Sequence, residues 1–483
     1  MRSVTTWMPR ARSMTIARVL LLSLLATPVA AQRPTLAPAT RAYVRIDTNV
    51  VALTNVRVID GTGAAPRDAQ TVVIRDGNIA AVGDAATTVV PAGALQVDLT
   101  GKTLIPGLVM VHEHLYYPAG PGIYGNYTES FSRLYLAGGV TSMRTGGNMN
   151  GYSELNIARA IERGDKAGPW IDATAPYLNG PNAFIQMHAL RTPAEARTFV
   201  NFWADQGATS FKAYMQISRE VLRAAIDAAH ARGLKVTGHL CSVTYREAAG
   251  LGIDNLEHGF LAATDFVTGK VPDECPGQGR GQQSVNAIDP SSDAVRSLIQ
   301  ELVRRKVALT STMTVFETFT PGRPMPPGIE VLVPAMREAY ERQHAQVARN
   351  ATSLYSTLLP KGMALELAFA RAGGLLVAGT DPTGGGGVIP GFSNQRAVEL
   401  LVEGGFTPVE AIRVATLNGA TYLGRASRVG SINVGKQADL VVINGNPAVR
   451  VADIRHVELV FRQGVGYDPA KLIASVTGRV GLF

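Results

Sequence analysis

The central part of the chain alternates short apolar, β-forming runs with amphipathic helical stretches, and this alternation restricts its fold more than any other feature. Helices with clear start signals lie between the runs; Thr192 and Thr407 each precede a proline at N1 and a glutamate at N3. Eight such alternations are typical of an α/β fold, the (β/α)8 TIM barrel. An open doubly wound sheet is the alternative, but no GxGxxG motif follows an early strand. The candidate strands occupy residues 104–111, 140–145, 170–176, 209–214, 235–240, 253–258, 307–312 and 375–380.

Residues 50–105 and 425–475 have a different pattern, in which short β-forming runs are separated by turns. Asp76-Gly77 is a hairpin signal that directly follows one such run. Neither segment contains enough strands for a stable sheet of its own. We therefore expect both chain ends to combine into one small β-sandwich domain, beside a barrel domain that spans residues 106–424.

The first 31 residues have the features of a secretory signal peptide. Arginines precede the apolar run "VLLLSLLATPVAA", in which Val29 and Ala31 occupy the −3 and −1 positions of a small-residue cleavage site. The apolar run is too short to span a membrane. We expect cleavage after Ala31, a periplasmic or secreted protein, and a flexible lead-in over residues 32–49.

The charge of the chain gives no indication of a nucleic-acid partner. The formal net charge of +8 falls to +4 without the leader, which contains no acidic residue and the arginines Arg2, Arg10, Arg12 and Arg18. No basic cluster or nucleic-acid recognition motif accompanies this small excess. Because no other uninterrupted apolar run reaches about 18 residues, we also expect no membrane span once the signal peptide is removed.

Ionisable side chains stand at the carboxyl ends of several candidate strands, where a (β/α)8 barrel carries its chemistry. The first strand ends in "VHEH", and strand alternation places His112 and His114 on the same face. Two neutral imidazoles side by side can bind a divalent metal. Each of these residues alone would fit a core or rim position, but four of the chain's eight histidines at strand ends, with a lysine and an aspartate, indicate a metal site. The other members of this set are Lys212, His239, His258 and Asp381.

The two cysteines fall near these strand ends as well. By strand alternation Cys241 shares the face of His239, so it could be a thiolate ligand or a disulfide partner. Cys275 follows the next strand, in a loop at the same end of the barrel. Because cysteines of exported proteins commonly pair, we favour a Cys241–Cys275 disulfide.

Taken in order, these motifs resemble the amidohydrolase superfamily, and more narrowly the imidazolonepropionase-like metal-dependent hydrolases that include bacterial prolidases and related carboxypeptidases. The resemblance covers nearly all of residues 50–465. The motifs that carry it are "IPGLVMVHEH", "SFKAYM", "TGHL", "EHG", "AGTDP", "GFTPVEAIRVATLNGATYLG" and "GSINVGKQADLVVINGNP".

The resemblance implies two divalent metal ions, and the histidine-rich ligation favours Zn²⁺. Burial in an apolar strand would lower the pKa of Lys212 and leave free amine to react with carbon dioxide. Asp381 would take a proton from the metal-bridging hydroxide and return it to the leaving nitrogen. The implied ligands are His112, His114 and Asp381 on one ion, His239 and His258 on the other, and a carboxylated Lys212 as the bridge.

Substrate-contacting residues are harder to identify. Relatives often follow the fifth-strand histidine with an Ala-Tyr pair whose tyrosine can meet a substrate carboxylate, but here Leu240-Cys241 stands in that place. Tyr245, farther along, is the candidate for this role. Tyr116, Tyr117 and Tyr214 lie beside metal ligands and could either line the pocket, where Tyr214 would contact the substrate, or merely pack. His188, in the long loop after the third strand, is a further candidate for substrate contact.

The sequence thus predicts an exported binuclear amidohydrolase that cleaves a carbon–nitrogen amide bond. The expected substrate is a small molecule, a dipeptide or an N-acyl amino acid, as in prolidases and carboxypeptidases. A lactonase or phosphotriesterase-like esterase with the same metal site is one alternative, and a non-catalytic periplasmic binding protein is another. The family's habit of association also suggests a homo-oligomer.

Overall fold

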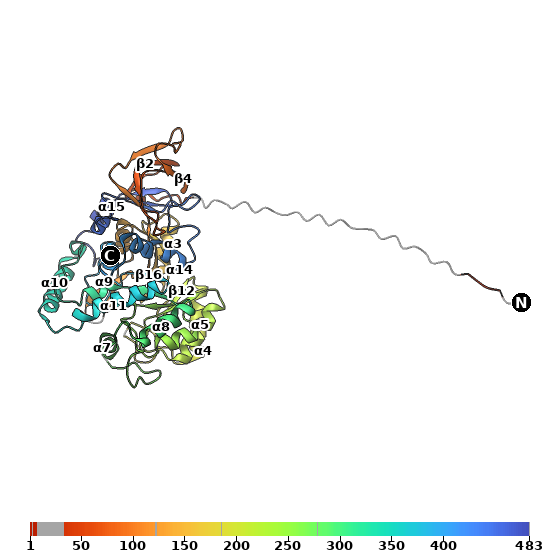
Figure 1. Ribbon diagram of the computed structural model, residues 1–483, viewed down its shortest axis with the longest axis vertical. Helices are drawn as coiled ribbons and strands as arrows, with labels where there is room; N and C mark the ends of the chain where they lie inside the picture. Colours follow the sequence, from red (N-terminus) through yellow and green to blue (C-terminus); the bar gives the residue numbers. More distant parts are fainter. Residues whose placement is uncertain (2, 7–32, 121–122, 185, 278, 483) are drawn as a thin grey trace. The chain divides into compact units, whose positions relative to one another are not determined.

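The structure is a computed structural model, and it describes residues 1, 3–6, 33–120, 123–184, 186–277 and 279–482 (Figure 1). The chain divides into two units, Met1–Gln32 and Arg33–Phe483. The predicted signal peptide falls mainly on residues 7–31, which lie outside the described residues, so it stays a prediction. None of the described helices combines the length and the apolar character that a membrane crossing requires.

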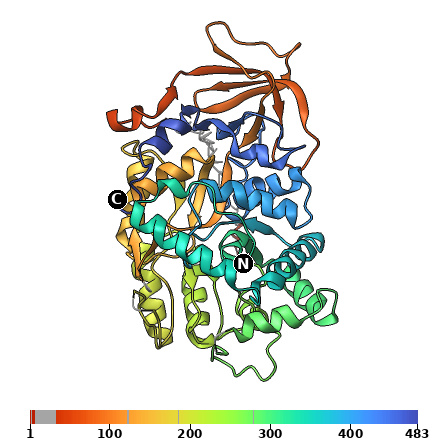
Figure 2. The same cartoon turned by 90° about the vertical axis from the view of Figure 1, so that its left-hand side faces the viewer.

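Strands from both ends of the second unit form one nine-stranded sheet. Its order is β1-β19-β18-β17-β6-β2-β3-β4, and β5 pairs with β2. In Figure 2 the first of these strands, in orange, lie at one end of the unit. The strands are β1 (Val44–Ile46), β2 (Val50–Val58), β3 (Arg67–Arg75), β4 (Asn78–Asp84), β5 (Leu95–Asp98), β6 (Thr103–Pro106), β17 (Leu440–Ile443), β18 (Val457–Arg462) and β19 (Val465–Tyr467).

The two faces of strand β17 serve two different cores. Leu440 and Val442 pack in the sheet's own apolar cluster. Val441 and Ile443, which alternate with them, belong to the main cluster that also fills the rest of the unit. One face of the sheet is thereby held against the parallel strands described next.

The remaining long-range β structure consists of eight short parallel strands. Strands β11, β10 and β7 form one sheet, and β12 to β16 form a second in sequential order. A parallel bridge between Thr174 and Ser210 joins the first sheet to the second, and the backbone N–H groups of Thr380 and Asp381 donate to the carbonyl of His112 at the other junction. The α/β fold is confirmed, and this domain is TIM-barrel-like. The strands are β7 (Leu108–Glu113), β10 (Val140–Thr145), β11 (Trp170–Asp172), β12 (Ser210–Ala213), β13 (Lys235–Gly238), β14 (Asn255–Glu257), β15 (Ala308–Ser311) and β16 (Leu376–Ala378).

Helices connect each consecutive pair of these parallel strands. Two of them begin with the predicted caps: Thr192 Oγ1 accepts from Glu195 N at α4, and Thr407 Oγ1 accepts from Glu410 N at α13. The helices are α1 (Pro38–Arg41), α2 (Thr128–Ala137), α3 (Tyr152–Glu162), α4 (Pro193–Asp205), α5 (Arg219–His230), α6 (Tyr245–Leu251), α7 (Arg280–Ala287), α8 (Asp293–Arg304), α9 (Met313–Glu317), α10 (Pro334–Arg349), α11 (Tyr355–Arg371), α12 (Phe392–Glu403), α13 (Pro408–Arg413), α14 (Gly419–Tyr422) and α15 (Pro469–Ala474). Shorter helical turns are η1 (Ile329–Val331), η2 (Val414–Asn418) and η3 (Val451–Arg455).

The strand predicted over residues 104–111 is in fact two strands that belong to different sheets. β6 ends at Pro106 and pairs with β17, whereas β7 begins at Leu108 and pairs with β10. Gly107 lies at the join, where a Cβ atom would come within 2.1 Å of Thr141 Oγ1. Only glycine therefore allows the chain to pass from one sheet to the other at this point.

The segment expected to be a flexible lead-in is structured over residues 33–49. Helix α1 lies in this segment, and β1 pairs antiparallel with β19 near the other end of the chain. Arg33 also forms an ion pair with Asp47 at 2.9 Å. The local sequence did not indicate this structure, because β1 pairs with a strand near the other end of the chain and the Arg33 contact is made by side chains. The sandwich description and the domain boundaries stay predictions.

Candidate metal centre

The six predicted ligands all lie at the carboxyl ends of the parallel strands. His112 is on β7 and Lys212 is on β12. His114, His239 and His258 directly follow β7, β13 and β14, and Asp381 lies three residues after the end of β16. Parallel strands that run side by side bring such ends to one rim. The fold thus gathers residues that are far apart in sequence.

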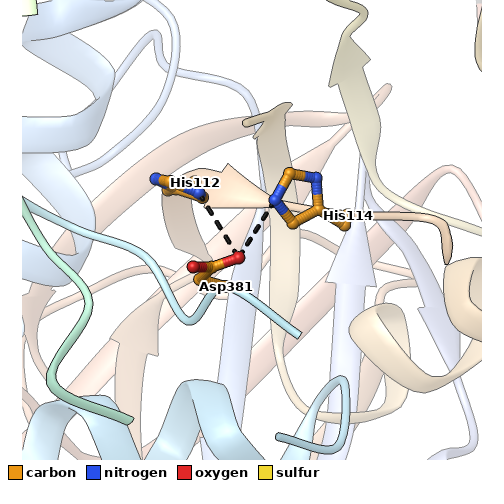
Figure 3. Close-up of side chains that lie close together, drawn as sticks. All are labelled: His112, His114 and Asp381. Carbon is orange, nitrogen blue, oxygen red and sulfur yellow. Dashed lines mark ion pairs between the residues drawn. The ribbon is translucent and has the colours of Figure 1, made fainter. Parts of the chain in front are cut away.

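His112, His114 and Asp381 form the most compact part of the site, and their side chains point toward one another (Figure 3). His114 Nε2 lies 3.1 Å and His112 Nε2 lies 3.6 Å from the same Asp381 oxygen, Oδ1. One donor atom from each of the three residues lies within 4.8 Å of the other two. All three side chains are buried. This is a compact group of nitrogen and oxygen donors of the kind that divalent metals bind.

Hydrogen bonds on the far side of each ring fix the tautomers of both histidines. His112 Nδ1 lies 2.7 Å from the Glu257 carboxylate, and His114 Nδ1 lies 3.3 Å from the Gly147 carbonyl. These partners only accept, so Nδ1 carries the proton in each ring. Each Nε2 atom then presents its lone pair to the site, where Lys212 Nζ lies 3.1 Å from that of His112 and the Tyr116 hydroxyl lies 3.4 Å from that of His114. Metal sites whose histidines are oriented from behind have the same arrangement.

Lys212 is buried against this group. Its Nζ lies 3.1 Å from His112 Nε2, and the side chain is 1% exposed. Burial lowers the pKa of Lys212 to about 8, although Glu257 and Asp381 act in the opposite direction. A lysine with this pKa keeps a fraction of free amine at neutral pH.

His239 and His258 lie next to the compact group. Their ring centroids are 4.3 Å apart, and His258 Nδ1 is 3.6 Å from Asp381 Oδ2 and 2.9 Å from Thr312 Oγ1. His258 Nε2 is buried and has no hydrogen-bond partner among the described residues. Because an orphaned buried nitrogen is costly, this atom fits a place where a metal ion binds.

Burial also keeps these imidazoles neutral. It lowers the pKa of His114 to about 4 and that of His239 to about 3, and it takes the pKa of His258 well below its usual value. Burial alone would raise the pKa of Asp381, but its contacts with His112 and His114 hold it well below its ordinary range. Burial and Lys212 lower the pKa of His112 as well, but Glu257 and Asp381 outweigh them, so that its pKa is raised. The site therefore offers neutral imidazoles at His114, His239 and His258, and an ionised carboxylate at Asp381, in the neutral pH range.

Two of these residues have left-handed backbone conformations. His258 has φ 69° and Asp381 has φ 57°. For residues with a Cβ atom such conformations cost of order 1–3 kcal/mol and persist where the surroundings enforce them. The strain at both positions agrees with a functional role.

A buried ion pair behind His112 was not predicted from the sequence. Glu257, which holds His112, also lies 3.1 Å from Arg144 Nη1, and both residues are essentially unexposed. His112 and Lys212 lower the pKa of Glu257 enough to outweigh the effect of burial. The only signal in the sequence is that both residues lie within predicted strands, where a buried charge needs a partner.

The cavity at the site is small, about 80 Å³. Tyr214 lines it, as predicted, and so do three further tyrosines, Tyr116, Tyr124 and Tyr177. The hydroxyl groups of Tyr116 and Tyr177 are hydrogen-bonded to each other. These aromatic side chains line the cavity beside the candidate metal ligands.

The other two predicted substrate contacts do not line this cavity. Tyr245 is fully buried, and its hydroxyl is in hydrogen-bond contact with the carbonyls of Glu257 and Gly259. It supports the strand-end backbone and does not face the cavity. His188 is exposed and stacks on Phe199 with the two rings 6.1 Å apart, away from the lining of the site.

Cys241 and Cys275 form a disulfide, with their Cα atoms 4.8 Å apart. This is the favoured prediction, and it rules out Cys241 as a thiolate ligand in this structure. The bridge ties the segment after β13 to the loop that precedes α7. It lies two residues from His239.

Comparisons with known proteins agree with this arrangement. The Amidohydrolase family model matches residues 336–467. An imidazolonepropionase of Deinococcus radiodurans is 37% identical over 118 residues, which cover 22% of this chain and 29% of that protein. The crystal structure of a proposed prolidase from Bifidobacterium longum is 25% identical, has a TM-score of 0.66, and covers 89% of this chain and 99% of that chain. A Xaa-Pro dipeptidase with methionine bound in its active site is 18% identical, has a TM-score of 0.65, and covers 87% of this chain and 100% of that chain; at this identity the match shows the fold alone.

The sequence matches are local: the chain spans less than a third of the length of the curated imidazolonepropionases it resembles. The structural match, by contrast, runs over nearly the whole unit. With the rim of candidate metal ligands, these findings support the assignment to the amidohydrolase superfamily that the motifs predict.

Proposed function

We propose that the chain is an exported, metal-dependent hydrolase that cleaves a carbon–nitrogen amide bond in a dipeptide or an N-acyl amino acid, with prolidase-type activity as the specific expectation. The convergence of His112, His114 and Asp381 beside the buried Lys212 carries this proposal. The assignment to the amidohydrolase superfamily supports it, and so does the similarity to the proposed prolidase of Bifidobacterium longum.

The donor set fits two divalent ions, for which we propose Zn²⁺. His112, His114 and Asp381 would hold one ion, and His239 and His258 would contribute to the second. When bound, such ions supply Lewis acidity and lower the pKa of a water molecule toward neutrality. Glu257 keeps the His112 lone pair directed at the site, and the tyrosines that line the cavity restrict the entry of bulk water.

Asp381 has the properties of the residue that moves the proton. Its carboxylate is ionised at neutral pH and lines the cavity, with Oδ1 3.6 Å from His112 Nε2 and 3.1 Å from His114 Nε2. It can accept a proton from the attacking water and donate it to the leaving nitrogen. The Thr383 hydroxyl donates to Oδ1 at 2.8 Å and helps to fix the orientation of this carboxylate.

Lys212 is proposed to react with carbon dioxide and to serve as the carboxylated bridging ligand. An ammonium group cannot ligate a cation, whereas a carbamate is an anionic oxygen donor. The depressed pKa of Lys212 and the orphaned Nε2 of His258 both support this assignment. Carboxylation would also remove the unfavourable proximity of a cationic amine to the histidine ligands.

A parallel assay tests the function. Zinc-reconstituted protein would be given dipeptides, N-acyl amino acids and lactones, with product release measured for each class. We expect turnover of the amide substrates and bound metal by elemental analysis. Turnover of lactones alone would instead support the esterase alternative, and stoichiometric metal without any turnover would support a binding protein.

A further inference from the structure

The candidate metal centre has too little space to hold a whole substrate. Its cavity of about 80 Å³ accommodates the reacting bond and little else. A second cavity of about 470 Å³ adjoins it, and the two share Phe184 and His239 in their linings. The larger volume lies in the range of ligand pockets, about 300–1,000 Å³.

The second cavity, which we call the amide cavity, has an uncharged lining. Apart from His239, none of the described residues that line it has an ionisable side chain, because Cys241 and Cys275 are joined in the disulfide. Its apolar surface includes Met215, Leu240 and the disulfide itself. A charged group bound there would lose water without gaining a partner of opposite charge, which is unfavourable.

Two side-chain amides in this cavity are available to a ligand. Gln216 and Gln282 are partly exposed, and neither side chain has a hydrogen-bond partner among the described residues. Asn179, in contrast, is engaged, since its Oδ1 accepts from the backbone N–H groups of Gly180 and Gln216. The free glutamine amides can pair with a neutral amide, carbamate or hydroxyl group.

Phe184 stands at the boundary between the two cavities. Its side chain is 54% exposed, which is unusual for a large aromatic residue, and its ring lies 5.9 Å from that of Tyr214. An exposed aromatic ring beside an apolar pocket is suited to pack against a ligand that passes from one cavity to the other.

We propose that the amide cavity binds a bulky, uncharged acyl half of the substrate, so that the enzyme prefers N-acyl amino acids with large neutral acyl groups to free dipeptides. This inference rests on the proposed amide hydrolysis and adds the substrate class. A free dipeptide would bring its ammonium group toward a lining that holds no carboxylate among the described residues.

Three substrates test the charge and the size of the acyl half separately, because they share the glycyl-proline bond and differ only at the amino end. They are glycyl-proline, N-acetyl-glycyl-proline and N-benzyloxycarbonyl-glycyl-proline. We expect kcat/KM for the benzyloxycarbonyl substrate to exceed that of the free dipeptide by at least about tenfold, with the acetyl substrate in between. Equal kcat/KM values for the benzyloxycarbonyl and acetyl substrates would overturn the assignment of the cavity.

Glycine-to-leucine variants inside and outside the amide cavity provide a matched test of this assignment. Gly281 lines the cavity in α7, and a Cβ atom there would meet only ordinary contacts, at 3.4 Å or more. Gly281→Leu should lower kcat/KM for the benzyloxycarbonyl substrate by at least about tenfold and that for glycyl-proline by less than about twofold. Gly250→Leu is the control, an exposed glycine in α6 with open space around it. Gly277→Leu, in the loop beside the disulfide, replaces Gly281→Leu if that variant does not fold.

A binding measurement separates this inference from the proposed function. Isothermal titration calorimetry with N-benzyloxycarbonyl-glycinamide should give at least about tenfold weaker binding for Gly281→Leu than for the wild type and Gly250→Leu. If this holds in a protein that hydrolyses no amide, the cavity assignment stands and the proposed function falls. If amides are hydrolysed but Gly281→Leu affects all three substrates equally, the cavity assignment falls alone.

Discussion

The two β regions of this molecule differ in the kinds of side chains that they bury. The nine-stranded sheet fills its own core with apolar side chains such as Leu53, Val442 and Phe461. The parallel strands bury several charged residues, including Arg144, Lys212 and Glu257, whereas the described strands of the sheet bury Arg462. Buried charges cost free energy and are retained where they have a role. We therefore expect the sheet to contribute mainly to stability and the parallel strands to contribute the chemistry.

Replacing a lysine in each region gives the largest expected contrast. Lys212→Ala should abolish metal loading and turnover, because it removes the proposed bridging ligand between the two ions. Lys102→Ala removes a partly exposed lysine directly before β6 of the sheet, 2.6 Å from Glu458, and should change neither metal loading nor turnover. Elemental analysis gives the metal content of both variants, and steady-state kinetics gives their kcat. Full activity with stoichiometric metal in Lys212→Ala would refute the bridging role.

Removing a large apolar side chain from the sheet should affect stability alone. Phe461 is fully buried in the sheet's cluster, so Phe461→Ala should lower the free energy of unfolding by ~3–5 kcal/mol. Denaturant unfolding gives this value. At temperatures where the variant is folded, kcat/KM should match the wild type, and a large loss of kcat/KM would mean that the sheet contributes to the site.

The buried carboxylate behind His112 should have an intermediate effect. Glu257→Gln keeps the shape but removes the charge that orients His112 and balances Arg144, and metal affinity should fall by about 10–100-fold. Competition with a metal chelator measures the affinity. Glu458→Gln in the sheet is the matched control, and equal metal affinity in the two variants would show that Glu257 has no positioning role.

The smallest expected effect is on pH dependence. Lys212 reacts with carbon dioxide only as the free amine, and below its pKa of about 8 that fraction decreases as the pH falls. At a fixed concentration of dissolved carbon dioxide, activation of metal-free protein by zinc should be about tenfold slower at pH 6 than at pH 7. The initial rate of recovered activity reports this step. A rate independent of pH would exclude free Lys212 amine as the limiting reactant.

Strand periodicity could predict the rim of the site, because an ionisable residue at the end of a buried apolar strand needs a partner or a ligand. It could not predict what depends on contacts between strands. The Glu257–Arg144 pair joins β14 to β10, and no local pattern links them. Tyr245 is close to His239 in sequence but not to the cavity, since α6 turns its side chain toward the backbone. The break between two strands at Gly107 has no local signal either, because its contact with Thr141 exists only in three dimensions.

The pairing of β6 with β17 has a consequence for biosynthesis. Strand β6 is synthesised before its partner β17, which lies more than 330 residues later in the chain. Until then its edge is exposed and able to pair with other chains. Because β6 continues through Gly107 into the strand that carries His112, the last part of the chain to be synthesised completes the support of the first ligands. Truncation near the C-terminus would therefore be expected to leave an aggregation-prone polypeptide, even with every candidate ligand present.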